Sequence, residues 1–558
     1  MTAPQRYLRV ASRPWQAALM HTEWVPGRWG GTQPPVTVDS RTRSFAQEHL
    51  GPPVPAPPPT VPAVQASRLG DATCRSLFPD VVASTDDLER ARASRGMSYL
   101  DFLQWRTSAP NAAPMPAPDA VLFPDSHDQV LRVLDVCSRE EIAVVPVGGG
   151  TSVTGALTLA DSRRDDSALA IAMSTTRLDR IIDVDDISGI AHVECGVTGP
   201  QLEAHLTDWT LGHFPQSWER ASIGGFIAAR SSGQSSSGYG RIEDMLLGAQ
   251  VATPVGTWDV GGFPAASIGP DLRHLILGSE GTLGVVTSAR LRLKRRPSVR
   301  QFAAAVLPGD FERAASALRA LAQSPLRPTV MRASDAAETA AMLTMSLPSG
   351  VLGSAVGAYL RMRSALPGSL IVLGWEGTGE SDVAAARARS RDVLDEAIWL
   401  GGRPGRAWER SRFHGPYLRD ALMDEGYLVE TFETVTTWSN IAALHERVRE
   451  AALEVLGERC YVMAHISHTY DTGASLYFTV LAGGWHDPEV AARRWREAKA
   501  TITDAIVDAS GALSHHHGIG RDHRRWLPAQ IGDTGMAVLA SIKATVDPSG
   551  VMNPGALL

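Results

Sequence analysis

Two glycine-rich loops contain residues whose types and spacing suit phosphate binding. The first, PVGGGTS at 146–152, places three glycines after a β-branched run and ahead of two hydroxyl residues. The second, EGTLGVV at 280–286, leads into another predicted strand. Glycine lets the backbone approach a ligand closely and direct N–H groups at phosphate oxygens, although the first loop alone is equally typical of a simple turn. The pair predicts a dinucleotide site. Its predicted contacts are Pro146, Val147, Gly148, Gly149, Gly150, Thr151, Ser152, Glu280, Gly281, Thr282, Leu283, Gly284, Val285 and Val286.

A third segment, SIGGFIAARSSG at 222–233, is rich in small residues that suit close packing against a flat ring system. Ala229, Arg230, Ser231 and Ser232 are its predicted ligand contacts. Three such segments in this order form a stronger signal than any one of them.

Other side chains in the C-terminal half could do chemistry, but their patterns alone favour simpler interpretations. His515, His516 and His517 could bind a metal ion, yet adjacent residues of an extended segment point to opposite sides. We therefore expect no metal. Tyr477 alternates with apolar neighbours in SLYFTV, which is typical of a core tyrosine, and lone arginines such as Arg332 and Arg419 are usually solvated.

The elements that must position these residues divide the chain into five predicted parts. At 558 residues the chain is too long for one core, and 44% apolar with 20% charged residues is typical of globular proteins. Short β-rich runs with a βαβ-like opening, including a helix over 125–139, predict one lobe. Alternating helices and strands, such as a helix over 382–400, predict an α+β cap. The predicted parts are an N-terminal extension with a Pro-rich linker (1–63), a helical segment packed on the core (64–117), the first lobe (118–296), the cap (297–530) and a C-terminal segment returning to the first lobe (531–558).

The charge balance and the cysteine content exclude several classes of protein. A net charge of -7 without a basic stripe argues against nucleic acid as a partner. Four scattered cysteines fit a reducing compartment, and the N-terminus lacks the pattern of a secretory signal. The uncharged stretch 339–360 is interrupted by proline and glycines, so we do not expect it to cross a membrane.

Three C-terminal segments, TFETVTTW at 431–438, SHTYDTGASLYF at 467–478 and SHHHGIGRDHRRWL at 514–527, closely resemble the alkyldihydroxyacetonephosphate synthase (alkylglycerone-phosphate synthase) family. The likeness extends upstream through the glycine loops to about residue 90. The resemblance implies an α+β, two-lobed FAD-binding fold of the vanillyl-alcohol-oxidase (PCMH) type, with 118–296 as the FAD-binding domain and 297–530 as the substrate-binding cap. It adds Ser217 and Ser222 to the FAD contacts. Relatives with covalent flavin place a histidine in the first loop, where this chain has none, so non-covalent FAD is expected.

The same resemblance implies exchange of the acyl chain of an acyl-dihydroxyacetone phosphate for a long-chain alcohol, without net oxidation. Flavin N5 would form an adduct with the substrate carbon while the carboxylate leaves and the alcohol enters. Tyr477 matches the family's general acid/base, and cationic neighbours should lower its pKa, with the run His515, His516 and His517 as helpers. Arg419 matches the arginine that binds the substrate phosphate, and Arg332 matches a second arginine required for activity.

Two other functions stay open: an FAD-dependent 2-hydroxyacid (D-lactate-type) dehydrogenase or oxidase, and a flavin-fold protein without catalysis. The stretch HISHTYDTGASLY, with His465 and His468, lacks the Asp-Gly-Asn turn of the dehydrogenases. For the synthase, 339–360 is a candidate wall of an apolar tunnel or a flexible connection. We expect lipid-like substrates, a homodimer, and a cytoplasmic location with peripheral membrane contact. The final GALL is not the Ser-Lys-Leu peroxisomal signal.

Overall fold

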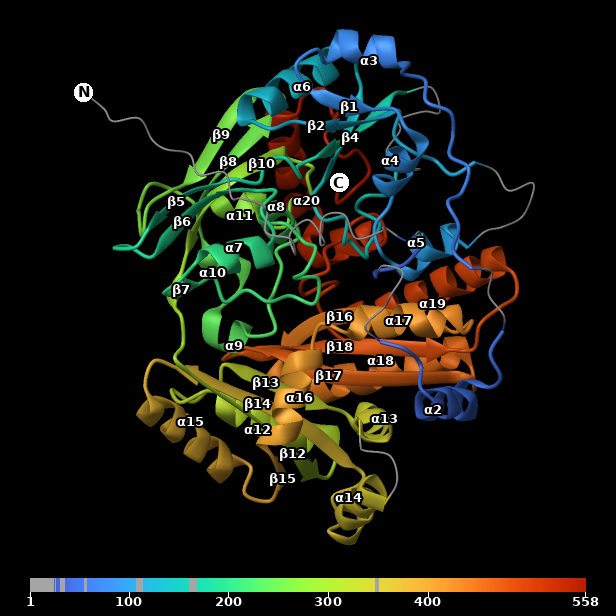
Figure 1. Cartoon of the computed structure of the whole chain (residues 1–558), viewed down its shortest axis with the longest axis vertical. Coiled ribbons are helices and arrows are strands. Elements are labelled where there is room, and N and C mark those ends of the chain that lie inside the picture. Colours follow the sequence, from blue (N-terminus) through green and yellow to red (C-terminus); the bar gives the residue numbers. More distant parts are fainter. Residues whose placement is uncertain are drawn as a thin grey trace.

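The computed structural model describes residues 25, 27–30, 36–54, 58–106, 114–159, 168–346 and 351–558, and within these ranges the chain forms two stacked lobes (Figure 1). The upper lobe contains a four-stranded and a five-stranded sheet, and the lower lobe contains a seven-stranded sheet. The α+β, two-lobed architecture expected from the sequence is therefore observed. Parts of the N-terminal extension with its Pro-rich linker, and of 339–360, lie outside the described residues.

The four-stranded sheet contains the predicted βαβ opening. Its order is β1-β2-β4-β3, with β2 and β3 both parallel to β4. The helix expected from residue 125 begins at His127, because the Ser126 side chain caps its first turn by accepting from Gln129 N. Apolar residues of this helix and of β2 to β4 form one core cluster. The elements are β1 (Val82–Ser84), β2 (Ala120–Phe123), α6 (His127–Arg139), β3 (Ala143–Val147) and β4 (Ala170–Ser174).

The five-stranded sheet is antiparallel, in the order β5-β6-β10-β8-β9. Short helices between β6 and β8 lie beside it and lead toward the lower lobe (Figure 1). Thr198 is the N-cap residue of α7, and its backbone N–H donates to Gln201 Oε1 of the capping box. The elements are β5 (Ile181–Asp185), β6 (Ile190–Glu194), α7 (Gly199–His205), β7 (Trp209–Thr210), α8 (Ile223–Ala228), α9 (Ser236–Tyr239), α10 (Ile242–Met245), β8 (Leu246–Thr253), β9 (Gly256–Gly261), α11 (Arg273–Ile276), β10 (Val285–Arg292) and β11 (Lys294–Arg295).

The seven-stranded sheet of the lower lobe is antiparallel, in the order β15-β12-β14-β13-β17-β18-β16. Successive side chains of a strand point to opposite faces. In β18, Phe478 and Val480 are fully buried in the core shared with the helices, whereas Tyr477 and Thr479 face a cavity between the lobes. The strands are β12 (Val299–Pro308), β13 (Val330–Ser334), β14 (Gly368–Gly377), β15 (Ile398–Gly401), β16 (Leu428–Thr437), β17 (Cys460–Thr469) and β18 (Gly473–Ala482).

The helices of the lower lobe pack mainly against this sheet and each other. One prediction was wrong: the helix expected over 382–400 ends at Val393, and 398–401 pair with β12 as strand β15, because this apolar run extends the edge of the sheet. The helices are α12 (Phe311–Ala322), α13 (Ala336–Ser346), α14 (Val351–Met362), α15 (Glu380–Val393), α16 (Gly402–Ser411), α17 (Gly415–Asp424), η1 (Trp438–Asn440), α18 (Ile441–Leu456) and α19 (Pro488–Asp508).

The two ends of the described chain pack on different lobes. In the N-terminal part, α2 (Ser40–Leu50) contacts β17, α5 (Tyr99–Gln104) contacts α19, and α3 (Asp71–Leu77) and α4 (Asp87–Arg92) lie beside the upper lobe (Figure 1). After η2 (Arg524–Trp526) and α20 (Leu527–Val546), Asn553 N donates to Val144 O of β3. The C-terminal segment thus returns to the upper lobe.

Candidate active site

A cavity of about 520 Å³ lies between the lobes and is lined by most of the residues predicted from the sequence. These are Pro146, Gly148, Gly149, Gly150, Thr151, Ser152, Ser217, Ser222, Ala229, Ser231, Ser232, Glu280, Gly281, Gly284, Val285, Val286, Arg332, Arg419, Tyr477, His516 and His517. Five predicted residues do not line it: Val147, Arg230, Thr282, Leu283 and His515. Val147, Thr282 and Leu283 are buried behind the loops. Arg230 forms an ion pair with Glu243.

The glycines of the first loop occupy their positions for different physical reasons. A Cβ on Gly148 would lie 2.4 Å from Ser222 Oγ, and one on Gly149 would lie 2.1 Å from Arg220 O. These two glycines are therefore required by the close approach of the segment 220–222. Gly150 has φ of 69° and open space where a Cβ would point, so its backbone borders the cavity without obstruction. This cradle of small residues, with Thr151 and Ser152 beside it, fits a dinucleotide phosphate.

The third segment joins the cradle to the sheet of the lower lobe. Ser231 Oγ lies 3.1 Å from His213 Nε2, and Ser232 Oγ lies 3.2 Å from His468 Nδ1 on β17. Ser236 Oγ also contacts His468 Nδ1, at 2.8 Å. These hydrogen bonds fix small side chains where the two lobes meet. A flat ring system has room against this wall of the cavity.

Tyr477 lies in the middle of β18 and lines the cavity. Its ring stacks on His465 of the neighbouring strand, with centroids 5.1 Å apart, and contacts His517 edge-on at 5.7 Å. Burial raises the pKa of Tyr477 to about 12, although Thr431 and Arg419 act to lower it. Arg419 is thus a cationic neighbour that lowers this pKa, as expected, but desolvation of the phenolate dominates and the net shift is upward. Tyr477 therefore carries its proton at neutral pH.

Arg332 is held beside Tyr477 by a buried charged cluster. Its Nη2 donates to Glu338 Oε1 at 2.7 Å, and its Nη1 lies 2.9 Å from His465 Nε2. His465 Nδ1 lies 3.1 Å from Glu338 Oε1, which fits a neutral imidazole that donates from Nδ1 and accepts at Nε2. Burial would raise the pKa of Glu338, but His465 and Arg332 lower it to about 2. The cluster fixes the direction of the Arg332 guanidinium.

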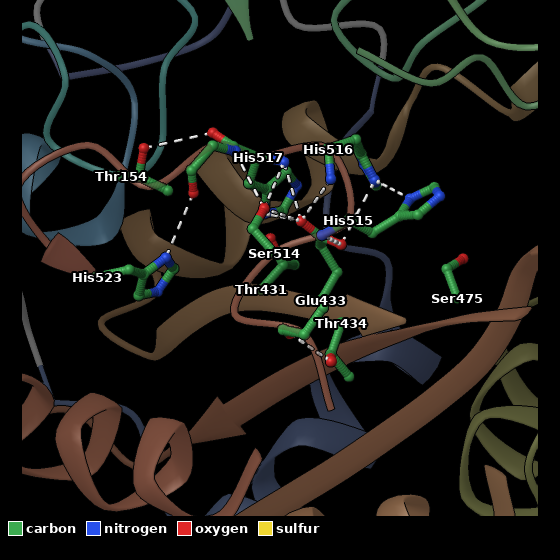
Figure 2. A network of polar contacts seen from close by, with 12 residues as sticks. Thr154, Thr431, Glu433, Thr434, Ser475, Ser514, His515, His516, His517 and His523 are labelled. Carbon is green, nitrogen blue, oxygen red and sulfur yellow. Dashed lines mark hydrogen bonds and ion pairs between the residues drawn. The ribbon is translucent and has the colours of Figure 1, made fainter. Parts of the chain in front are cut away.

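The histidine run is organised by the carboxylate of Glu433 on β16 (Figure 2). Glu433 Oε2 accepts from His515 N at 2.7 Å, and Oε1 accepts from His516 N at 3.0 Å and from His517 N at 2.9 Å. Ser514 Oγ donates to the same carboxylate at 2.7 Å. Burial would raise the pKa of Glu433, but the adjacent histidines and the backbone donors lower it below its ordinary value. The loop therefore closes around one buried anion.

His515 lies behind His516 and does not line the cavity. Its Nε2 lies 2.6 Å from Tyr470 Oη, and its Nδ1 lies 2.9 Å from His516 Nδ1. Ring nitrogens of His468, His515 and His516 lie within 4.8 Å of one another. Burial and like-charged neighbours lower the pKa of His515 and His468 well below 6.5, so both are neutral near pH 7. This geometry describes a hydrogen-bonded imidazole cluster, and the absence of a metal stays a prediction.

Replacing Glu433 with glutamine should destabilise the histidine loop. An amide has one acceptor oxygen and turns an NH2 group toward backbone N–H donors, so at least one buried donor loses its partner. We expect a loss of about 1–3 kcal/mol in the free energy of unfolding, with a lower kcat as the histidines shift. Thermal unfolding and steady-state kinetics measure both. Glu446→Gln on the exposed side of α18 is the control, and equal effects of the two changes would contradict the role of Glu433.

The buried histidines should make the protein sensitive to mild acid. Burial lowers the pKa of His213 and His517 to about 3 and that of His523 to about 4. Below pH 6.5 the unfolded chain binds protons that the folded chain excludes, so stability is complete above pH 6.5 and is lost as pH falls. Each group contributes a slope of about 1.4 kcal/mol per pH unit in this window.

Melting temperatures between pH 7 and 5 test this expectation. The variant His517→Gln should show a shallower decline than the wild type, and His486→Gln, at an exposed position, should not. A decline that is identical in all three proteins would contradict the assignment to buried histidines.

Arg419 reaches the cavity from α17. Its Nη1 donates to Met97 O at 2.8 Å, and its guanidinium carbon lies 4.4 Å from the centroid of the Phe102 ring. Its Nε is buried and has no hydrogen-bond partner in the ranges that the structure describes. A guanidinium held in this way retains donors for an anionic group in the cavity.

The uncharged stretch 339–360 contributes to the cavity through α13. Ala341, Met342 and Met345 line it, next to Met463 and Leu481 of the sheet. Methionine side chains adapt to flexible apolar ligands. This part of the stretch gives the cavity an apolar wall, and its role in a tunnel stays a prediction; residues 347–350 lie outside the described ranges.

Comparisons with known proteins agree with this arrangement. Residues 118–260 match the family described as FAD binding domain, and residues 296–557 match the C-terminal domain of FAD linked oxidases. Alkyldihydroxyacetonephosphate synthase of Dictyostelium discoideum is 31% identical over 487 residues, which are 85% of this chain and 78% of that protein. A mitochondrial cytochrome D-lactate dehydrogenase of Arabidopsis thaliana is 26% identical, covering 79% of this chain and 73% of its own length.

A solved structure of an alkyldihydroxyacetonephosphate synthase superimposes on the chain with a TM-score of 0.77 at 29% identity, and the match covers 92% of each chain. The fold and the cavity define an FAD-dependent flavoprotein of the two-lobed type, and FAD is its cofactor. The chain belongs to the alkyldihydroxyacetonephosphate synthase family. No helix in the described ranges is both long and apolar enough to span a bilayer.

Several residues in or next to the cavity were not predicted as site residues. Glu338 and His465 hold Arg332, Glu433 holds the histidine loop, and Arg412 lines the cavity from the end of α16. The only sequence signal for Glu433 was its place in TFETVTTW, where a charged residue interrupts a β-rich run. The partners of these residues are distant in sequence, so spacing alone does not reveal them.

Proposed function

We propose that the protein exchanges the acyl chain of an acyl-dihydroxyacetone phosphate for a long-chain alcohol and so forms an ether lipid precursor. The observation that carries this proposal is the placement of Tyr477, Arg332 and Arg419 around one cavity that also has an apolar wall on α13. Family membership supports the same reaction, because the relatives are named as synthases of alkyldihydroxyacetone phosphate. The expected product needs no net oxidation or reduction.

The glycine loops would hold the FAD phosphates through backbone N–H groups, with Thr151 and Ser152 as further donors. When bound, non-covalent FAD supplies a nucleophilic ring nitrogen for the exchange. Tyr477 would act as the general acid/base of the exchange: as a phenolate it takes the proton beside the substrate carbonyl, and as a phenol, the form that its raised pKa favours at neutral pH, it returns that proton. The removal and return of a proton beside the substrate carbonyl requires such a reversible group.

The two arginines would have separate tasks in this reaction. Arg419, with its unused Nε, binds the phosphate of the substrate by a charge-assisted contact. Arg332 is fixed by Glu338 and His465, so its guanidinium orients the reacting end of the substrate. Ala341, Met342 and Met345 bind the long chain, because each buried methylene contributes about 0.8 kcal/mol. His516 and His517 border the cavity as neutral groups and assist proton movement near Tyr477.

The alternative is a dehydrogenase or oxidase of 2-hydroxy acids, which the D-lactate dehydrogenase relative favours. Anaerobic mixing of the yellow holoenzyme with D-lactate distinguishes the two functions. The synthase should stay oxidised and should convert labelled hexadecanol and acyl-dihydroxyacetone phosphate into the ether product. Rapid bleaching of the flavin without ether formation would favour the dehydrogenase.

The substrates are lipid-like, so we propose a cytoplasmic protein with peripheral membrane contact. The end of α14 supports this contact, because Tyr359 and Met362 are exposed beside Arg361 and Arg363. Basic and apolar side chains together favour the surface of an anionic bilayer. A homodimer stays a prediction.

A further inference from the structure

A polar patch on the cavity wall has hydrogen-bonding groups without partners among the residues that the structure describes. It consists of Gln216 and Gln234 from the upper lobe and Arg412 from the end of α16, and we call it the Arg412 subsite. Gln234 Nε2 donates to Arg412 O at 3.2 Å and to Gln216 Oε1 at 3.0 Å. The three residues therefore connect the two lobes at one side of the cavity.

The hydrogen bonds of the Arg412 subsite fix the orientation of both amides. Gln234 must present its NH2 group to the carbonyl of Arg412, so its Oε1 points elsewhere, and Gln216 must present Oε1 to Gln234. Gln216 Nε2 and Gln234 Oε1 are both buried, and neither has a hydrogen-bond partner among the described residues. Arg412 Nε and Nη1 are buried and unpartnered as well. Three unused donors against one unused acceptor favour a ligand rich in acceptors.

Arg412 also has no counter-ion in the described part of the chain. The nearby carboxylates of Glu376 and Glu409 pair with Arg300, at 2.8 and 3.1 Å. Burial lowers the pKa of Arg412 to about 10, and Arg300 adds to this effect, so the guanidinium is desolvated but still charged at neutral pH. A buried cation without a partner is costly, and an anionic ligand would remove that cost.

The position of the Arg412 guanidinium is fixed by aromatic rings. Its carbon lies 5.0 Å from the centroid of Phe214 and 4.9 Å from that of Phe413. Phe413 in turn stacks on Trp218, with centroids 5.4 Å apart. These contacts hold the fork of donors in place before a ligand arrives, which lowers the entropy lost on binding.

We propose that Gln216, Gln234 and Arg412 form an oxyanion subsite of the cavity, separate from Arg419. This deepens the proposed function and rests on it: the exchange reaction involves two oxyanions, the phosphate of the substrate and the carboxylate of the released fatty acid. Both present the acceptor oxygens that the Arg412 subsite lacks. Since Arg419 binds the phosphate in the proposed function, we expect the subsite to bind the carboxylate, and the titration distinguishes this from the reverse assignment.

Calorimetric titration of the holoenzyme with inorganic phosphate and with hexanoate tests the proposal without measuring transfer. Arg412→Gln should weaken binding of at least one anion by about tenfold or more, because charge-assisted hydrogen bonds are lost. Arg412→Lys should restore part of the loss. Arg410→Gln, which removes an exposed charge two residues away, should bind both anions as the wild type does. A dependence on Arg412 for hexanoate assigns the carboxylate to the subsite, and a dependence for phosphate assigns the phosphate.

Two results would overturn the proposal. One is anion binding that Arg412→Gln leaves unchanged, or that the wild type lacks. The other is a loss of FAD affinity without a loss of anion affinity, which would show that the cluster serves the cofactor. If Arg412→Gln does not fold, Gln216→Leu removes one donor and should weaken the same anion by about threefold to tenfold. These results do not depend on whether the protein makes an ether, so failure of the subsite and failure of the proposed function are distinguishable.

Discussion

Replacing Tyr477 with phenylalanine is expected to lower kcat for acyl exchange by about 10² to 10⁴, the range typical of a lost general acid/base. The hydroxyl is the only group removed, and the ring can keep its stacking on His465 at 5.1 Å. KM for the substrate and the FAD content should therefore change little. Exchange of the hydrogen beside the substrate carbonyl with deuterated water should slow by a similar factor, because the same group moves that proton.

Tyr461→Phe is a matched control for this prediction. Tyr461 lies on β17 of the same sheet, its hydroxyl donates to Ala337 O at 2.9 Å, and burial raises its pKa to about 12 as well. It does not line the cavity. The control should keep the wild-type kcat and exchange rate. Equal losses in both variants, or full hydrogen exchange in Tyr477→Phe, would show that Tyr477 is not the proton-transfer group.

The glycine loops could be predicted from the sequence because their requirement is local. A side chain does not fit where the backbone borders a phosphate or passes within van der Waals contact of another segment. The glycine run 148–150 therefore indicates such a close approach. The structure adds that Gly148 and Gly149 serve the contact with 220–222, whereas Gly150 borders the cavity. The sequence pattern and the structure therefore both indicate a close backbone approach at this loop, and the structure adds the role of each glycine.

The supporting residues could not be predicted because their partners are far along the chain. Glu433 accepts hydrogen bonds from residues 82 to 84 positions later, and Arg332 contacts His465 across 133 positions. The pairing of β13 with β17 brings Arg332 to His465, and the segment after α19 reaches Glu433 because Ala512 N donates to Val435 O of β16. The raised pKa of Tyr477 has the same origin, because burial between two lobes is a property of the folded chain. The residue types suggested the chemistry, and tertiary contacts determine the protonation states of the side chains involved.

Removing the charge of Arg419 is expected to lower kcat/KM for acyl-dihydroxyacetone phosphate by about 100-fold or more. Two charge-assisted hydrogen bonds to a phosphate contribute about 1.5–3 kcal/mol each, and Arg419→Gln loses both. Arg419→Lys keeps the charge but lacks the planar fork, so it should recover only part of the rate. Because Arg419 also donates to Met97 O and stacks on Phe102, the melting temperature and FAD content of each variant must be measured alongside.

A substrate without the phosphate separates binding of that group from structural damage. With acyl-dihydroxyacetone as the substrate, the wild type should be about as slow as Arg419→Gln, because Arg419 then has no phosphate to bind. The variant should show almost no further loss with this substrate, so the two changes should not be additive. If Arg419→Gln loses the same factor with and without the phosphate, Arg419 supports the fold of α17 around Met97 and Phe102, and the phosphate must bind elsewhere in the cavity.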